Sequence, residues 1–193
     1  MKIQVGQTAP NFEAVDIYGK HVRLSDFKGR KIVIGFFRNV NCPFCNRRVH
    51  QIMLNNISFK QKDVQLLFLF ESSAETLKKS AFHRGISPWP LVGDPKKEIY
   101  DQYGVGTSML GVVRTMLSAD MKTANREAKE LGLPAEKDKD ASMSLLPADF
   151  FIDENFKIVK AHYGKHLDDH VDYNELLGFA GIEDPFKKLH AVK

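Results

Sequence analysis

The chain has 193 residues, of which 43% are hydrophobic and 27% charged, a composition typical of one ordinary globular domain. No apolar run approaches the roughly 20 residues that cross a bilayer, and residues 1–10 lack the apolar core of a secretion signal. We therefore expect a cytoplasmic protein with no membrane partner. The net charge of +4 comes from scattered basic pairs, which argues against a nucleic-acid partner.

The N-terminal part of the chain predicts a hairpin followed by a buried strand. Residues 12–17 and 21–24 flank Tyr18-Gly19-Lys20, which is a turn signal. Residues 31–37 are apolar, rich in β-branched and aromatic side chains, and too short for a stable isolated helix. They predict a strand that is buried on both faces.

Cys42 and Cys45, the two cysteines of the chain, stand at the start of the next predicted helix. Pro43 suits the first helical position, so Cys42 falls at or near the N-cap of a helix that extends to about residue 60. A thiol there faces unpaired N–H groups and the positive end of the helix, which favour the thiolate, and Arg38 adds a nearby cation. Cys45 lies one turn deeper on nearly the same face. A Cys42–Cys45 disulfide is therefore plausible, with Cys42 the more exposed, attacking sulfur and Cys45 the resolving one.

The following segments alternate strands and helices. Residues 64–70 predict a second buried strand, parallel to the first. Ser72 to Glu75 fits a capping box for a helix that ends near residue 85, and Asp94-Pro95 starts a helix through residue 103 after a short extended piece at 88–92. Residues 148–152 and 157–162 predict a second hairpin, residues 172–179 a last helix, and residues 184–193 a frayed tail. The fold class is α/β, a mixed sheet with helices on both faces, and we expect a single domain over residues 1–193.

Residues 106–144 interrupt this alternation. Met109, Val113, Met116 and Leu117 recur at helical spacing, and charged residues dominate from 120 to 140. We interpret the segment as a helical insertion with a mobile, lysine-rich end that covers the core or an oligomer partner. The alternative is that the methionines simply fill the core.

Two metal-site hypotheses find little support. Cys42, Cys45 and His50 supply three zinc ligands, but no second pair completes a tetrahedron. His162, His166 and His170 are spaced like a metal set with Asp168 and Asp169, but Gly164 breaks the segment and His162 belongs to a strand, so no common helix face exists. We expect no metal, and no cofactor besides a redox-active disulfide.

Several motifs together resemble a known family. Residues 5–12, the Gly19 hairpin, residues 24–29, Cys42-Pro43-Phe44-Cys45, residues 93–95 and residues 103–105 are similar to the peroxiredoxins, and more narrowly to the alkyl hydroperoxide reductase/thiol-specific antioxidant (AhpC/TSA) branch of the thioredoxin superfamily. The match covers roughly residues 3–105 and 145–179. It implies a thioredoxin-like fold, with the insertion unmatched.

The resemblance also implies roles for individual residues. Cys42 would attack a peroxide and become a sulfenic acid, which Cys45 would capture. Pro147 resembles the cis-proline that packs beside the cysteine pair in such folds. Independently of the resemblance, Phe44 is a candidate, with Phe36, Phe37 and Trp89, for the wall of an apolar pocket around the sulfur.

The chain also departs from the family pattern. Gly35 and Asn39 stand where peroxiredoxins carry a proline and a threonine or serine, and the later arginine, expected near residues 146–147, is missing. Arg38 and Asn39 are the candidate replacements as donors. Cys-x-x-Cys at a helix start is also the thioredoxin and glutaredoxin arrangement.

Three functions remain open. The first is a thiol peroxidase that reduces hydrogen peroxide or organic hydroperoxides and is recycled by an external thiol reductant, such as a thioredoxin-type protein. The second is a thiol-disulfide oxidoreductase acting on protein or small-molecule disulfides. The third is a redox sensor or adaptor whose insertion docks a partner. A homodimer is compatible with each.

Overall fold

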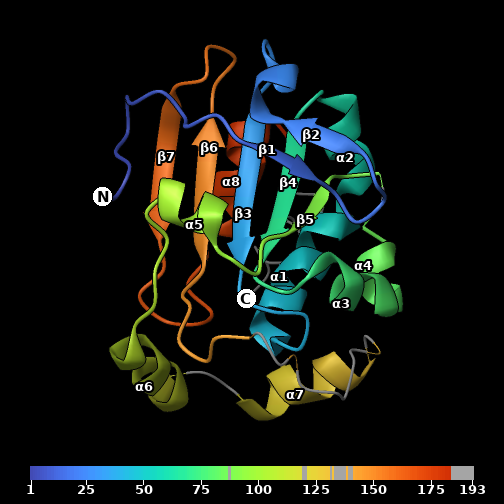
Figure 1. Cartoon of the computed structure of the whole chain (residues 1–193), viewed down its shortest axis with the longest axis vertical. Coiled ribbons are helices and arrows are strands. Elements are labelled where there is room, and N and C mark those ends of the chain that lie inside the picture. The colour runs from blue at the N-terminus through green and yellow to red at the C-terminus, as the bar shows by residue number, and fades with distance from the viewer. Residues whose placement is uncertain (87, 119–120, 131, 133–137, 139–140, 184–193) are drawn as a thin grey trace.

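A five-stranded mixed sheet forms the centre of the structure (Figure 1), in the order β5-β4-β3-β6-β7. The middle strand is β3 (Ile32–Phe37), and β4 (Gln65–Phe70) and β5 (Leu91–Gly93) continue the sheet in parallel on one side. On the other side, β6 (Ala148–Ile152) runs antiparallel to β3 and forms a hairpin with β7 (Ile158–Tyr163). The computed structural model describes residues 1–86, 88–118, 121–130, 132, 138 and 141–183. The tail predicted to fray lies outside them.

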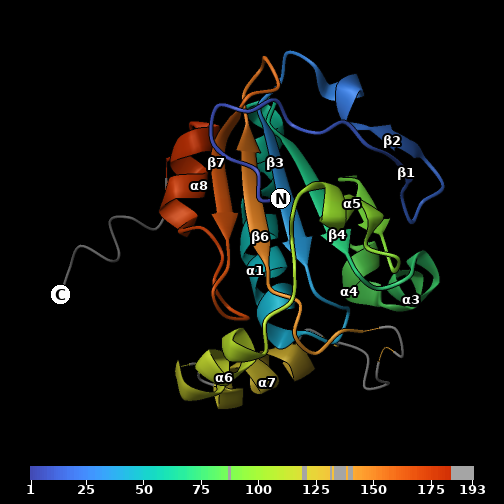
Figure 2. The ribbon, with the colours of Figure 1, turned by 60° about the vertical axis from the view of Figure 1, so that its left-hand side comes forward.

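Each face of the sheet has its own core because successive side chains of a strand point to opposite faces. All six residues of β3 are buried, as the sequence predicted. Val33 and Phe37 join one cluster with α1 (Pro43–Leu54), α2 (Asn56–Gln61) and α8 (Tyr173–Ala180). Ile34 and Phe36 join the other, which α5 (Glu98–Gln102) and the N-terminal segment cover. Figure 2 shows α8 on one side of the sheet and the small hairpin of β1 (Glu13–Val15) and β2 (His21–Arg23) on the other.

Several predicted helices are shorter than expected, and their breaks have local causes. The helix from Pro43 ends at Asn55, whose amide donates to the Tyr173 hydroxyl 2.8 Å away, and α2 starts after it. The helix predicted to end near residue 85 is divided at Ser80 into α3 (Ala74–Lys79) and α4 (Ala81–Arg84). The predicted capping box is wrong, because the N-cap is Ser73, which accepts a hydrogen bond from the Thr76 amide.

The prediction that Asp94 and Pro95 start a helix is wrong, because α5 starts at Glu98 and its N-cap is Lys97. The Asp94 carboxylate still accepts hydrogen bonds from the amides of Glu98 and Ile99. Between β2 and β3 lies a 3-10 turn, η1 (Leu24–Phe27).

The insertion contains two helices, α6 (Met109–Ser118) and α7 (Met121–Glu130), which lie below the sheet in Figure 1. The alternative that the methionines fill the core is wrong, because Met109 and Met116 are both 67% exposed. Val112 and Thr115 form the buried face of α6 instead, and the Thr115 hydroxyl accepts from the Leu167 amide. Of the charged stretch at residues 120–140, the structure describes 121–130, 132 and 138, and the mobility of its lysine-rich end stays a prediction. Within the described part of the chain, no helix combines the length and apolar character needed to cross a bilayer.

Candidate active site

Cys42 is the N-cap residue of α1, as predicted. Its backbone is extended (φ −69°, ψ 110°), Pro43 follows at the first helical position, and the Cys42 sulfur accepts a hydrogen bond from the Cys45 amide at 3.3 Å. This geometry is that of a capping side chain, with sulfur in place of the usual oxygen. An N–H group and the positive end of the helix therefore face the sulfur and favour its negative charge.

The second sulfur lies within bonding reach of the first. Cys45 donates its thiol hydrogen to Cys42 across 2.7 Å, and both cysteines are reduced. The expectation that Cys42 is the more exposed sulfur is wrong, because each cysteine is only 1% exposed. The reason is that Cys42 sits beneath the insertion and not at an open surface.

The environment separates the two thiols in acidity. Burial by itself raises the pKa of Cys42, but the Cys45 thiol, the positive charge of Arg38 and the Cys45 amide together lower it to about 6. For Cys45, burial and the neighbouring Cys42 raise the pKa well above its ordinary value. Cys42 is thus a thiolate at neutral pH while Cys45 keeps its proton, which is the arrangement of an attacking and a resolving thiol.

Arg38 is the predicted cation, and it follows β3 directly. Its guanidinium lies close enough to the Cys42 sulfur to lower the pKa of that thiol. Nη1 donates to the Met143 carbonyl at 2.9 Å, while the buried Nε makes no hydrogen bond of ordinary geometry with a described residue. A side-chain hydrogen bond from Arg38, as well as its charge, helps to lower the pKa of Cys42.

The insertion covers this group of residues. Besides the contact between Arg38 and Met143, the Asp138 amide donates to the Asn41 side chain at 3.0 Å. On the other flank, Arg47 of α1 pairs with Glu127 of α7 at 2.6 Å. These contacts hold the insertion over the start of α1.

The remaining predicted site residues have different surroundings. Asn39 is 6% exposed, and its side chain accepts from the Asn41 amide and faces Glu71, with no hydrogen bond to either sulfur. Phe44 is buried, and the Arg47 guanidinium lies 5.6 Å from its ring centre. Pro147 precedes β6, whose first residue pairs with Phe36, so it lies at the same edge of the sheet as Cys42. Its isomeric state and its contact with the sulfurs stay predictions.

The departures from the peroxiredoxin pattern have a structural basis. A Cβ atom at Gly35 would lie 2.6 Å from the Phe37 ring, which stacks on Phe70 at 5.0 Å between ring centres. Near the position of the missing arginine, Leu146 packs against Gly111 of α6, where an added Cβ would lie 2.7 Å from it. In this chain, aromatic packing therefore surrounds Gly35, where the family carries a proline, and α6 of the insertion lies against residue 146, near where the family carries an arginine.

Comparison with known proteins agrees with the site. The family model described as "AhpC/TSA family" matches residues 5–161. The chain belongs to the AhpC/TSA family.

Relatives of this AhpC/TSA chain carry names of two kinds. It is 28% identical to the thiol-disulfide oxidoreductase ResA of Bacillus anthracis over 105 residues, 54% of this chain and 60% of that protein's length. The chain thus spans about three fifths of the ResA relatives that it matches. A Mycobacterium tuberculosis protein named as a peroxiredoxin is 24% identical over 153 residues, 74% of this chain and 97% of its own length.

Solved structures show the thioredoxin-like fold. Peroxiredoxin 6 of Arenicola marina matches with a TM-score of 0.64 and 18% identity, over 99% of this chain and 76% of that one. The thioredoxin domain of a thiol-disulfide oxidoreductase from Bacteroides vulgatus matches with a TM-score of 0.55 and 19% identity, over 93% and 99%. The predicted fold class is confirmed.

Sequence reasoning missed Glu71, which follows β4 as Arg38 follows β3 in this AhpC/TSA fold. Glu71 is 1% exposed, and burial raises its pKa to about 7 against the opposing influence of the Ser142 amide, Lys97, Asn39 and Arg38. These groups lie near, yet neither carboxylate oxygen makes a hydrogen bond of ordinary geometry with a described residue. A glutamate directly after the apolar run at residues 66–70 was the available signal.

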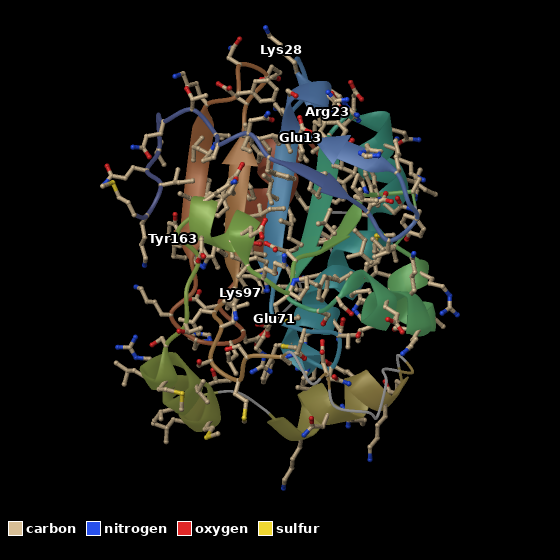
Figure 3. All side chains as sticks on the ribbon, in the orientation of Figure 1. Glu13, Arg23, Lys28, Glu71, Lys97 and Tyr163 are labelled. Atoms are coloured by element: carbon tan, nitrogen blue, oxygen red, sulfur yellow. The ribbon has the colours of Figure 1, made fainter. Side chains whose placement is uncertain are left out.

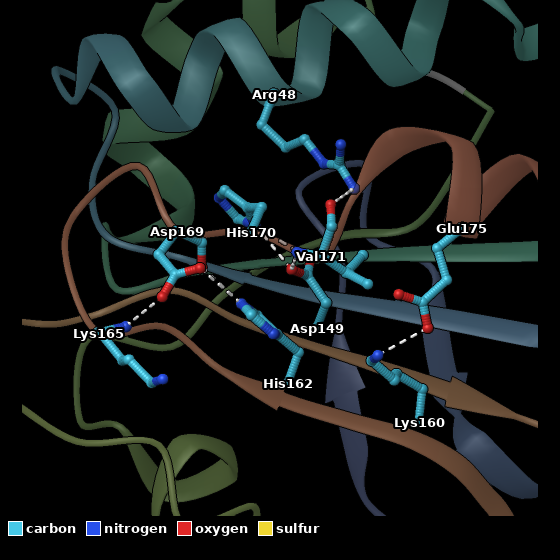
Figure 4. Close-up of polar contacts among 9 residues, drawn as sticks. All are labelled: Arg48, Asp149, Lys160, His162, Lys165, Asp169, His170, Val171 and Glu175. Carbon is cyan, nitrogen blue, oxygen red and sulfur yellow. Dashed lines mark hydrogen bonds and ion pairs between the residues drawn. The ribbon is translucent and has the colours of Figure 1, made fainter. Parts of the chain in front are cut away.

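A buried ion-pair network behind the site was also missed (Figure 4). Asp149 of β6 accepts from His170 Nδ1 at 3.0 Å and from the Val171 amide, and Arg48 donates to the Val171 carbonyl. The charge of His170 holds the pKa of Asp149 below its ordinary value, although burial opposes this.

Two of the histidines considered as a metal set, His162 and His170, bind different carboxylates in Figure 4. His162 contacts Asp169, whereas His170 contacts Asp149. His50 is exposed whereas both cysteines are buried. Among the described residues, no three histidine, cysteine or acidic side chains gather as a metal site would require.

Proposed function

We propose that this protein is a thiol-dependent peroxidase that uses Cys42 as nucleophile and Cys45 as resolving thiol. The observation that carries the proposal is the hydrogen bond from Cys45 to the acidic Cys42 sulfur at a helix start. Membership in the AhpC/TSA family over most of the chain supports it. The complete burial of both sulfurs supports a small oxidant, because a peroxide needs far less opening than a protein disulfide.

The reaction follows from the two acidities. The Cys42 thiolate attacks one peroxide oxygen, the O–O bond breaks, and the other oxygen leaves as water or an alcohol after taking a proton. Cys42 is then a sulfenic acid. The Cys45 sulfur displaces its hydroxyl, forming the disulfide and releasing water, and two electrons from an external dithiol restore both thiols.

In this proposal Arg38 also polarises the peroxide, besides stabilising the Cys42 thiolate. Acidity alone raises the thiolate fraction at pH 7 about 30-fold over a free cysteine, and low-pKa thiolates are weaker nucleophiles, which offsets part of that gain. Faster reaction therefore requires polarisation of the peroxide. The Arg38 guanidinium, whose charge and hydrogen bonding already act on the Cys42 sulfur, is the candidate donor for this, whereas Asn39 faces Glu71.

A second candidate is thiol-disulfide exchange, favoured by the Cys-x-x-Cys geometry and by the similarity to ResA. The two functions share every residue named so far. They differ in the size of the substrate that must reach Cys42, and hence in how far the insertion must open.

The test mixes pre-reduced protein with hydrogen peroxide and follows thiol loss in wild type, Cys42→Ser and Cys45→Ser. Peroxidase function predicts loss more than 30-fold faster than free cysteine at pH 7, none of it in Cys42→Ser, and a trapped sulfenic acid in Cys45→Ser. Oxidation at the rate of a free thiol, together with ready reduction of an insulin disulfide, would favour the second candidate. The homodimer stays a prediction that light scattering of the same sample tests.

A further inference from the structure

Glu71 and Arg38 occupy equivalent positions on neighbouring parallel strands. Phe37 and Phe70 are the last register pair of β3 and β4, and the Glu71 amide donates to the Arg38 carbonyl at 2.9 Å. A hydrogen bond also joins the loops that follow the two strands, since Ser72 Oγ accepts from the Val40 amide. The Glu71 carboxyl is therefore held at the same edge of the sheet as the start of α1.

The surroundings of this carboxyl compensate its charge only in part. Neither carboxylate oxygen makes a hydrogen bond of ordinary geometry with a described residue, and no ion pair of Glu71 is found among those residues, although the Ser142 amide and the Asn39 side chain act on it. Lys97, from the segment before α5, is the other cation that acts on it, and Figure 3 shows the two residues next to each other near the lower end of the sheet. Tyr100 of α5 also faces it, and burial raises the pKa of that phenol well above its ordinary value, so Tyr100 is neutral.

Arg38 links Glu71 to the cysteines because its charge acts on both. It favours the Cys42 thiolate and, more weakly, the Glu71 carboxylate. In the reduced protein the thiolate balances Arg38, so Lys97 is the cation left to act on a second buried anion. In the disulfide the thiolate is gone, so the positive charge of Arg38 acts on Glu71 alone.

We propose that Glu71 is a redox-linked proton site, which binds a proton when the Cys42–Cys45 disulfide is reduced and releases it when the disulfide forms. The proposal deepens the proposed function, since it rests on cycling of these two sulfurs, but it holds for either oxidant.

The proton balance is explicit. An external dithiol gives up two electrons and two protons and becomes a disulfide. The electrons break the Cys42–Cys45 bond, leaving Cys42 as thiolate, and one proton goes to Cys45. The second proton goes to Glu71 instead of the solvent. Glu71 thus takes up and releases the proton that balances the charge of the Cys42 thiolate, and it does not touch the reacting sulfur.

The test is the infrared difference spectrum between the protein reduced with dithiothreitol and the same protein oxidised to the disulfide, at pH 6.5. The expected spectrum has a protonated-carboxyl C=O band in the reduced state that shifts with ¹³C-glutamate labelling. The band is lost in Glu71→Gln and kept in Glu75→Gln, an exposed glutamate of α3 paired with Lys79. In Arg38→Met the band falls to less than half, because the coupling is removed while Glu71 remains.

Three results would overturn the proposal: no carboxyl band in labelled wild type, a band that survives Glu71→Gln, or an undiminished band in Arg38→Met. The labelled wild-type spectrum decides the matter even if a variant does not fold. Failure of the proposed function looks different, since the two cysteines would then not form a disulfide with a peroxide at all. A disulfide that forms without a carboxyl signal contradicts only the role of Glu71.

Discussion

Replacing Arg38 by methionine tests the central electrostatic claim, that a buried guanidinium keeps the Cys42 sulfur ionised. Methionine has a similar length and apolar stem but no charge. Because burial alone raises the pKa of this thiol, removing the cation leaves the Cys45 thiol and the amide of the helix start as the remaining stabilising groups. The variant therefore separates the contribution of the arginine from that of the helix.

The size of the effect follows from the proximity of opposite charges. An opposite charge in close contact typically changes a pKa by 1–3, so Arg38→Met raises the pKa of Cys42 from about 6 to about 8. The thiolate fraction at pH 7 then falls from about 0.9 to about 0.1, roughly tenfold. Above pH 9 the variant and the wild type are both fully ionised, so the difference in thiolate content disappears.

The assay is the ultraviolet absorbance of the thiolate as a function of pH, with the rate of iodoacetamide alkylation as a second readout. Arg38→Lys keeps the charge and should restore most of the acidity, whereas Arg38→Met also loses the hydrogen bond to Met143. Arg23→Met, at an exposed site on β2, is the matched control. A pKa in Arg38→Met within 0.5 of the wild-type value would show that the helix start suffices and that the charge argument is wrong.

Three further predictions concern stability and access. Burial lowers the pKa of His83 to about 3, so as pH falls the unfolded chain binds this proton before the folded protein does, and stability is lost from about pH 6.5 downward. His83→Gln should remove about 2 kcal/mol of the stability loss between pH 7 and pH 5. Urea-unfolding curves of the variant that keep the wild-type pH dependence would contradict this. Asp149→Asn removes the buried counter-charge of His170 and should lower the free energy of unfolding by about 3 kcal/mol in the same assay. A loss under about 1 kcal/mol would contradict this prediction. Glu127→Lys places a lysine opposite Arg47 and should speed the reaction of Cys42 with a bulky aromatic disulfide severalfold, without changing the pKa of the thiol. The control Glu130→Lys, at an exposed site on the same helix, should leave the rate unchanged. Equal rates in the two variants would mean that α7 does not limit access.

Features set by neighbouring residues were predictable from the sequence. The β3 strand followed from an uninterrupted apolar run, and the N-cap position of Cys42 followed from Pro43 at the next residue. The acidity of Cys42 and the proximity of Cys45 depend on one turn of helix. These predictions needed no knowledge of the rest of the chain.

Features set by distant contacts were not predictable in the same way. The row of Met109 and Met116 marks one face of a helix, but an apolar face is compatible with either orientation, and Thr115 lies inward because Leu167 supplies its partner. The partner of Asp149 lies 21 positions away in a loop. An aspartate inside the apolar strand 148–152 signals that a buried partner exists, without saying which one.

The burial of Cys42 was also beyond the sequence, and it bears on function more than the acidity does. A thiolate at a helix start serves a peroxidase and a disulfide exchanger equally, since both need a nucleophile ionised at neutral pH. What separates them is the cover formed by α7 with Asp138 and Met143, fastened through Arg38, Asn41 and Arg47. Two of these three fastenings lie in the loop that carries the cysteines, so opening the cover also disturbs the charge that keeps Cys42 reactive. A small peroxide needs little opening and would reach the sulfur while Arg38 keeps its hydrogen bond to Met143. A protein disulfide would reach the sulfur only after Arg38 has lost that hydrogen bond. Under the proposed function, access is therefore coupled to reactivity, and we expect the smaller substrate to be favoured on chemical as well as steric grounds.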